Sequence, residues 1–180
     1  MIQIYTGDGK GKTTASTGLA VRALGAGLRV FFAQFIKNGS SSEIRFLKEY
    51  GGERFTYFTR GSGKFIIGDP PPEECSRAAE TLDALKTALN SGRYDLVVAD
   101  EILGSLQARL FTSDDLKVLL DTADAHPEVE LILTGRNAPD FAVERAGLVS
   151  EVKCVKHYYT QGGTPVSRCH ARPVTAGRRR

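Results

Sequence analysis

The sequence has few cysteines, and their positions argue against two kinds of site. Cys75, Cys154 and Cys169 are the three cysteines among 180 residues, and no two of them have the short spacing of a zinc-ligand pair. An odd number of widely separated cysteines is typical of reduced thiols and not of a disulfide framework. We therefore expect neither a structural zinc site nor disulfide bonds.

Long apolar runs are also missing. No apolar segment approaches the roughly 20 residues that a membrane-spanning helix needs. The first residues, Met1 to Tyr5, lead directly into a glycine-rich loop, which leaves no room for a cleaved secretion signal before it. The apolar fraction of 41% and the charged fraction of 25% are ordinary for a globular domain and exclude disordered and fibrous classes. We expect a cytoplasmic protein without a membrane partner.

The positive charge is concentrated at the C-terminal end. The formal net charge is +3, and five arginines without any carboxylate among them lie in the last thirteen residues. They are Arg168, Arg172, Arg178, Arg179 and Arg180. Removing these five charges from +3 leaves −2 for the rest of the chain, so a basic groove for nucleic acid is not expected. We predict one folded domain over residues 1–162 and a flexible basic tail over residues 163–180.

Short apolar runs alternate with longer amphipathic segments along the domain. The predicted strands are residues 2–5, 29–35, 95–99, 130–133 and 148–155. Several are almost continuously apolar, as strands covered by helices on both faces are. Apolar residues recur every three or four positions from Cys75 to Leu89 and again after Thr112, which indicates helices. The pattern predicts an α/β fold with a doubly wound, mostly parallel sheet of the phosphate-loop NTPase (RecA-like) kind.

A phosphate-binding loop follows the first predicted strand. Its residues are Gly7, Asp8, Gly9, Lys10, Gly11, Lys12, Thr13 and Thr14. The glycines let backbone N–H groups gather around phosphate oxygens, and the helix that follows adds its own N–H groups. Lys12 is expected to reach the phosphates, and the Thr13 hydroxyl suits a Mg²⁺ ligand. The motif departs from the usual pattern at Thr6, where glycine is normal, so the loop is expected to have altered geometry.

Two other strand ends carry charged residues. Asp100 and Glu101 follow a buried strand, where phosphate-loop enzymes hold the acid that orients Mg²⁺. We predict Glu101 as the residue on the metal side, with Asp100 beside it. Arg136 follows the next strand and is placed to contact a polyphosphate bidentately. Since ligands of such sheets bind beyond the carboxyl ends of the strands, these side chains are expected to meet.

Together these segments resemble the ATP:corrinoid adenosyltransferase family of the phosphate-loop type. The matching stretches, in the family's order, are residues 5–14, 33–39, 68–70, 94–101, 133–139 and 155–157. The segments Gln-Phe-Ile-Lys from Gln34 and Thr-Gly-Arg-Asn-Ala-Pro from Thr134 make the resemblance specific. Thr6 is also what this family has, so the departure from the general motif becomes support.

The resemblance implies transfer of the 5′-deoxyadenosyl group of ATP to the Co(I) of a reduced corrinoid, with release of triphosphate. Cobalamin and cobyrinic acid a,c-diamide are the acceptors it suggests. Co(I) is itself a strong nucleophile, so a Ser/His/Asp arrangement is not needed, and the sequence shows none. Lys12, Arg136 and Mg²⁺ are implied to stabilise the leaving triphosphate, with Thr13 and Glu101 on the metal. ATP is implied to lie reversed relative to ordinary phosphate-loop enzymes, and Arg22 to lie near the nucleotide.

The corrinoid side of the resemblance rests on residues 61–69. Phe65 matches an aromatic residue that lines the lower corrin face and displaces the lower ligand of cobalt, and Ile67 stands where some members carry a second aromatic. The alternative is a mobile surface loop. His157 either borders the corrinoid or caps the last strand. An electron donor for Co(II) is implied as a partner, and the oligomeric state is open, with a homodimer as one possibility.

Two rival functions remain at this point. An ATP phosphohydrolase or kinase would use the same loop with water or a hydroxyl as acceptor. A non-catalytic module would bind nucleotide or nucleic acid with the arginine tail, and its affinity would fall steeply with salt. The charge of −2 outside the tail counts against the second rival.

Overall fold

Parallel strands form the centre of the protein. The computed structural model describes residues 1–64, 66 and 68–156. Within these residues the strands are β1 (Ile2–Thr6), β2 (Val30–Gln34), β3 (Phe55–Thr59), β4 (Leu96–Asp100), β5 (Glu130–Thr134) and β6 (Leu148–Glu151). They form one sheet in the order β3-β2-β4-β5-β1-β6, and every pairing is parallel. The predicted doubly wound parallel sheet is confirmed.

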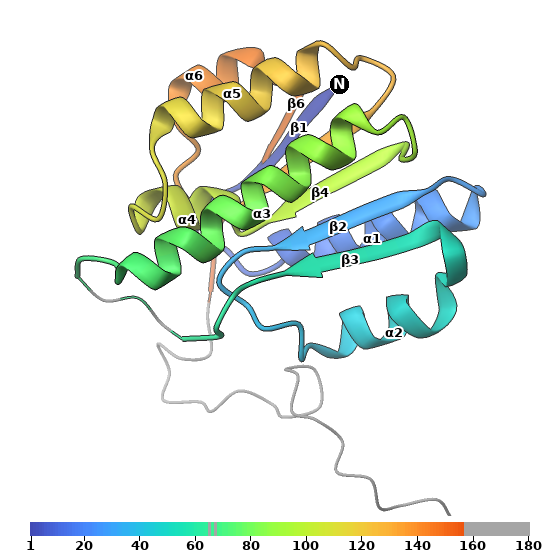
Figure 1. Cartoon of the computed structure of the whole chain (residues 1–180), viewed down its shortest axis with the longest axis horizontal. Coiled ribbons are helices and arrows are strands. Elements are labelled where there is room, and N and C mark those ends of the chain that lie inside the picture. The colour runs from blue at the N-terminus through green and yellow to red at the C-terminus, as the bar shows by residue number, and fades with distance from the viewer. Residues whose placement is uncertain (65, 67, 157–180) are drawn as a thin grey trace, which may run out of the picture.

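Helices cover both faces of this sheet (Figure 1). One face is covered by α1 (Lys12–Gly25) and α2 (Ser42–Tyr50). The other is covered by α3 (Pro72–Asn90), α4 (Ile102–Gln107), α5 (Ser113–Asp124) and α6 (Asp140–Arg145). A short 3₁₀ helix, Gly52–Arg54, precedes β3. Because both faces are covered, the central strands β2 and β4 are buried along their whole length, which explains their continuous apolar runs.

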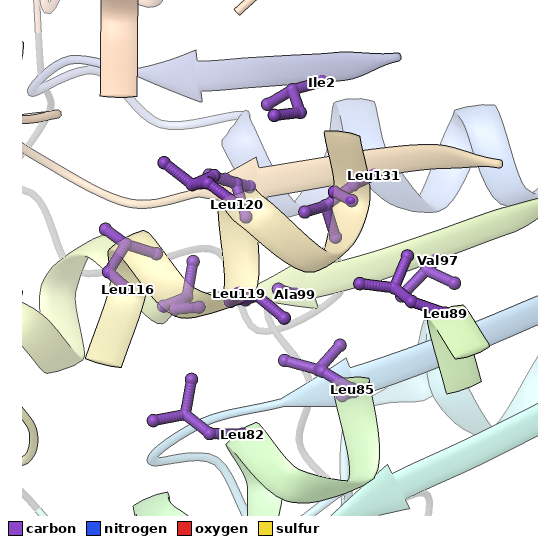
Figure 2. Close-up of a cluster of buried hydrophobic side chains, with 14 of the residues drawn as sticks. Ile2, Leu82, Leu85, Leu89, Val97, Ala99, Leu116, Leu119, Leu120 and Leu131 are labelled. Atoms are coloured by element: carbon purple, nitrogen blue, oxygen red, sulfur yellow. The ribbon is translucent and has the colours of Figure 1, made fainter. Parts of the chain in front are cut away.

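The larger core lies between the sheet and the helices α3 and α5. The stripes predicted from the sequence face the strands, and Figure 2 shows their leucines directed toward side chains of β1, β4 and β5. The labelled residues are Ile2, Leu82, Leu85, Leu89, Val97, Ala99, Leu116, Leu119, Leu120 and Leu131. Fully burying one such side chain stabilises a fold by about 1.5–3 kcal/mol. This packing fixes the sheet and therefore the positions of its strand ends.

The start of α5 was predicted from Thr112 and is confirmed in detail. The Thr112 hydroxyl accepts a hydrogen bond from the backbone N–H of Asp115, and the Asp115 carboxylate accepts one from the backbone N–H of Thr112. This reciprocal capping box satisfies two donors that the helix itself leaves free.

Five elements were not predicted, namely β3, α2, α4, α6 and the 3₁₀ helix Gly52–Arg54. The helices α4 and α6 have six residues each, too few for a repeating apolar stripe. The last strand was predicted over residues 148–155 but ends at Glu151. The chain leaves the sheet there because the Val152 carbonyl accepts a hydrogen bond from the backbone N–H of Gly9 at 2.7 Å.

Among the described residues, no helix is both long and apolar enough to cross a membrane.

Candidate nucleotide and corrinoid site

The phosphate loop lies between β1 and α1 and closes around the side chain of Lys12. The Lys12 ammonium donates hydrogen bonds to the carbonyl oxygens of Gly7 at 2.7 Å and Gly9 at 2.8 Å. Gly7 and Gly11 have φ values of 102° and 131°, which side chains rarely allow. Burial lowers the pKa of Lys12, and the nearby Glu101 carboxylate acts in the opposite direction. The loop therefore holds one cation at its centre, where an anion would stabilise it.

The segment after β6 packs directly against this loop. A Cβ atom on Gly9 would lie 2.7 Å from the Val152 carbonyl oxygen and 2.8 Å from that of Lys153. A Cβ on Gly7 would lie 2.5 Å from the same Val152 oxygen. Real Cβ atoms do not approach backbone oxygens this closely, so the close approach requires glycine at both positions, and the φ of Gly7 requires it a second time.

Thr6 ties the loop to the neighbouring strand end. Its hydroxyl accepts a hydrogen bond from the backbone N–H of Ala138 at 3.2 Å, in the loop that follows β5 and carries Arg136. Glycine at this position could not make the contact. The residue that departs from the general motif thus connects two of the predicted site segments.

Asp100 ends β4 as a fully buried carboxylate with three side-chain donors. The Gln34 amide and the Lys37 ammonium donate to its Oδ2, each at 2.9 Å, and the Thr134 hydroxyl donates to its Oδ1 at 2.8 Å. These donors come from β2, the loop after β2, and β5. A buried charge is tolerated only when it is paired in this way, so Asp100 fixes three strand ends relative to one another.

Glu101 turns away from the strand. Its backbone is left-handed, with φ of 63°, and its N–H donates to the Thr134 hydroxyl at 2.9 Å. The strand ends at Asp100. The direction of the Glu101 side chain is therefore set by the residue's own strained backbone, and not by the alternating side-chain directions of a strand. Burial raises the pKa of Glu101, and the charge of Asp100 raises it further. The two carboxylates therefore have different environments.

Lys37 was not assigned a role from the sequence, yet it lies at the centre of this cluster. Its ammonium donates to the Thr13 hydroxyl at 2.9 Å as well as to Asp100, and lies 3.9 Å from the Glu101 carboxylate. The signal that could have identified it is its place in the Gln-Phe-Ile-Lys segment, directly after a buried strand.

A cavity of about 980 Å³ opens over these groups. The predicted residues Asp8, Gly9, Lys10, Gly11, Lys12, Thr13, Thr14, Glu101 and Arg136 all line it. Other parts of its wall are Thr17, Gly18 and Val21 of α1, Glu43 of α2, and Lys37, Gly104, Gln107 and Cys154. The ends of four strands, β1, β2, β4 and β5, thus contribute charged side chains to one cavity.

Not every predicted residue lies in its wall. Gly7 contributes its carbonyl oxygen to Lys12. Arg22 is exposed on α1 outside the lining, near enough to Tyr5 for its charge to lower the pKa of that phenol, against the larger effect of burial. Phe65, Ile67, His157 and the arginine tail lie outside the described residues.

A second cavity of about 570 Å³ adjoins the first. It is lined by Ile36, Lys37, Asn38, Gly39, Ser40, Ser41, Gly63, Lys64, Ile66, Glu101, Gly104 and Ala108. Lys37, Glu101 and Gly104 line both cavities. Gly63, Lys64 and Ile66 of the predicted corrinoid loop therefore line a cavity that shares part of its wall with the first.

Comparison with known proteins agrees with this geometry. The family model described as ATP:corrinoid adenosyltransferase BtuR/CobO/CobP matches residues 1–168. The corrinoid adenosyltransferase of Escherichia coli (strain K12) is 32% identical over 164 residues, which cover 90% of this chain and 81% of that protein. Corrinoid adenosyltransferase CobA of Salmonella typhimurium is also 32% identical, with the same coverage. The Pseudomonas aeruginosa corrinoid adenosyltransferase is 30% identical and is covered to 79%. The chain belongs to the ATP:corrinoid adenosyltransferase family.

Proposed function

We propose that the larger cavity binds the triphosphate of ATP, that the smaller one receives the corrinoid, and that the adenosyl group is transferred at their shared wall. As a member of its family, the protein adenosylates corrinoids with ATP. In the proposed reaction Co(I) donates its electron pair to C5′ of ATP and a Co–C bond forms. The C5′–O bond breaks, and triphosphate leaves with the electron pair of that broken bond.

The observation that carries this division is the wall that the two cavities share. Lys37, Glu101 and Gly104 border both, so a nucleotide and a second ligand can meet there without crossing the sheet. Holding two reactants in contact is a large part of what catalysis of such a bimolecular transfer requires.

The polar groups of each wall suit the proposed ligand. Lys12, Arg136 and the N–H groups of the loop face the larger cavity and match a triphosphate. Each wall also holds one buried hydroxyl without a hydrogen-bond partner among the described residues, Thr17 in the larger cavity and Ser41 in the smaller. Both hydroxyl oxygens are closed to solvent, so a polar group of a bound ligand reaches them only after a movement of the wall.

The residues present also fit a Mg²⁺ ion. Mg²⁺ prefers oxygen ligands and commonly takes one or two protein groups together with substrate phosphates. The Thr13 hydroxyl and the Glu101 carboxylate would hold it, since both border the larger cavity and lie around a single ammonium group. When bound, Mg²⁺ supplies positive charge to the leaving triphosphate.

The chain's own residues carry the remaining steps. The Lys12 ammonium and the Arg136 guanidinium bind the triphosphate and stabilise the charge it gains as it leaves. Asp100 holds Lys37 and Thr134 in place through its hydrogen bonds. Phe65 is proposed to displace the lower ligand of cobalt, which makes Co(II) easier to reduce.

The partners beyond ATP and corrinoid also remain proposals. The resemblance supports an electron donor that reduces Co(II), and a homodimer is compatible with the exposed Leu148 and Val149 on the edge strand β6. The proposed domain covers residues 1–162, with a flexible basic tail over residues 163–180, in a cytoplasmic protein.

An anaerobic assay tests this function. The protein is mixed with Mg-ATP and chemically reduced cobalamin, and the Co(I) spectrum is followed. We expect loss of the Co(I) bands with formation of adenosylcobalamin, and no turnover in Lys12→Ala. An unchanged corrinoid spectrum, in a protein that binds ATP, would contradict the proposal.

A further inference from the structure

Lys37 has a position that the adenosyl transfer described above does not explain. Its ammonium donates at 2.9 Å to both the Thr13 hydroxyl and the Asp100 carboxylate, and the Glu101 carboxylate lies 3.9 Å away. The ammonium thus lies among a hydroxyl from the start of α1 and two carboxylates from the end of β4. These are hard oxygen ligands of the kind that bind Mg²⁺.

A strained turn holds Lys37 in this place. Ile36 has φ of 59°, which is unfavourable for a β-branched residue, and the N–H of Lys37 donates to the carbonyl of Phe35 across a γ-turn. The Thr59 hydroxyl donates to the Lys37 carbonyl at 2.7 Å. The Ile36 carbonyl accepts from the N–H of Gly63 at 2.7 Å. Such strain persists only where the surrounding structure enforces it, and it is concentrated at functional sites.

The charges around Lys37 explain why a cation is needed there. Asp100 is fully buried and Glu101 partly so, and two neighbouring carboxylates repel each other unless a cation lies between them. Lys12 and Arg136 also face Glu101. Lys37 is the cation whose hydrogen bonds reach both Asp100 and the Thr13 hydroxyl. One ammonium therefore uses the oxygen atoms that a divalent ion would need.

We propose that the Lys37 ammonium, held by Asp100, competes with the divalent metal for Thr13 and Glu101, so that metal binds only together with the nucleotide, whose phosphates add ligands. This inference rests on the Mg²⁺ site of the proposed function. Lys37 is then a positioning residue that excludes free divalent ions. Since it lines both cavities, the displaced ammonium stays at the wall where nucleotide and corrinoid meet.

The test measures binding of Mn²⁺ alone to the full chain, without nucleotide or corrinoid, from the electron paramagnetic resonance signal of free Mn²⁺. We expect weak binding to the wild type and to Lys37→Arg, which keeps the charge. Lys37→Met should bind at least about tenfold more tightly, because a neighbouring charge changes the stability of a charged carboxylate by about one to three pKa units. The matched control is Lys117→Met, which removes an exposed lysine of α5 paired with Asp114 at 2.9 Å and should bind as the wild type does.

Equal or weaker Mn²⁺ binding by folded Lys37→Met would overturn the proposal. If circular dichroism shows that this variant does not fold, Lys37→Gln provides the same test, since its amide can still bond to Thr13 and Asp100. The double variant Lys37→Met/Glu101→Gln locates the ion. If the double variant loses the Mn²⁺ affinity gained by Lys37→Met, Glu101 is a ligand for which Lys37 and the metal compete. If the double variant keeps that affinity, the proposal is refuted. Neither ATP nor corrinoid is present, so failure here is distinct from failure of adenosyl transfer.

Discussion

The hydroxyl of Thr134 offers a sharp test of how the acidic strand end is held together. It donates to Asp100 at 2.8 Å and accepts from the N–H of Glu101 at 2.9 Å, and the residue is fully buried. Thr134→Val keeps the shape of the side chain and removes both hydrogen bonds. Asp100 Oδ1 and the Glu101 N–H would then be buried without these partners.

The expected cost follows from these two groups. Leaving a buried donor or acceptor unsatisfied costs about 1–3 kcal/mol, and more for a charged group. Two such groups lower the free energy of unfolding by about 3 kcal/mol. For a domain of this size, about 2–4 °C is lost per kcal/mol, so the melting temperature should fall by roughly 10 °C.

Urea unfolding followed by circular dichroism measures this loss. The control is Thr122→Val, whose hydroxyl donates only to the carbonyl of Val118 within α5 and which should remain within about 0.5 kcal/mol of the wild type. If Thr134→Val were as stable as this control, the hydrogen bonds around Asp100 would not hold the strand ends, and our reasoning would be wrong.

Three further predictions concern the loop, a helix cap and the corrinoid. Gly9→Ala should weaken Mg-ATP binding at least about tenfold by calorimetry, because its Cβ would displace backbone lying 2.7 Å away. Asp115→Ala should lower the free energy of unfolding by about 1 kcal/mol near neutral pH. Hydrogen bonds from Thr112 lower the pKa of Asp115 in the folded protein. The stability that the carboxylate contributes is therefore fully present above its pKa in the unfolded chain, and it is lost as the pH falls through its pKa in the folded protein. Phe65→Ala should react normally with Co(I) but slowly from Co(II), in an assay supplied with each in turn.

Control variants distinguish these specific effects from a general loss of folding or activity. Gly25→Ala adds a Cβ that meets nothing within 4 Å and should bind ATP normally. Phe46→Ala removes an aromatic that is 51% exposed on α2 and should react normally from both cobalt states. Equal loss from Co(I) and Co(II) in Phe65→Ala would remove Phe65 from its proposed role. If the difference in free energy of unfolding between Asp115→Ala and the wild type stayed the same at acid pH, the predicted pH dependence of the helix cap would be wrong.

Much of the architecture follows from local patterns. The continuous apolar runs of β2 and β4 and the leucine stripes of α3 and α5 each depend on a few neighbouring residues, so they were predicted. The phosphate loop was equally clear, because its glycines and Lys12 act within one short segment. Elements too short to show a period, such as α4 and α6, were not.

The contacts that complete the site depend on distant segments and were not predictable in this way. Lys37 reaches Thr13 and Asp100 across 24 and 63 positions in the sequence. Val152 touches the loop only because β6 lies beside β1. Glu101 was predicted on the metal side from its place after a buried strand, but the left-handed backbone that brings it into the cavity wall was not predicted. No pattern among neighbouring residues in the sequence indicates these contacts between distant segments.

The most direct test of the account is the phosphate product of the complete reaction, measured by phosphorus-31 nuclear magnetic resonance. With Mg-ATP and reduced corrinoid under anaerobic conditions, we predict intact triphosphate in an amount equal to the adenosylcobalamin formed, and no phosphate product without corrinoid. Orthophosphate, pyrophosphate or ADP as the product would contradict the claim that the loop binds a leaving triphosphate, and would favour phosphoryl transfer instead.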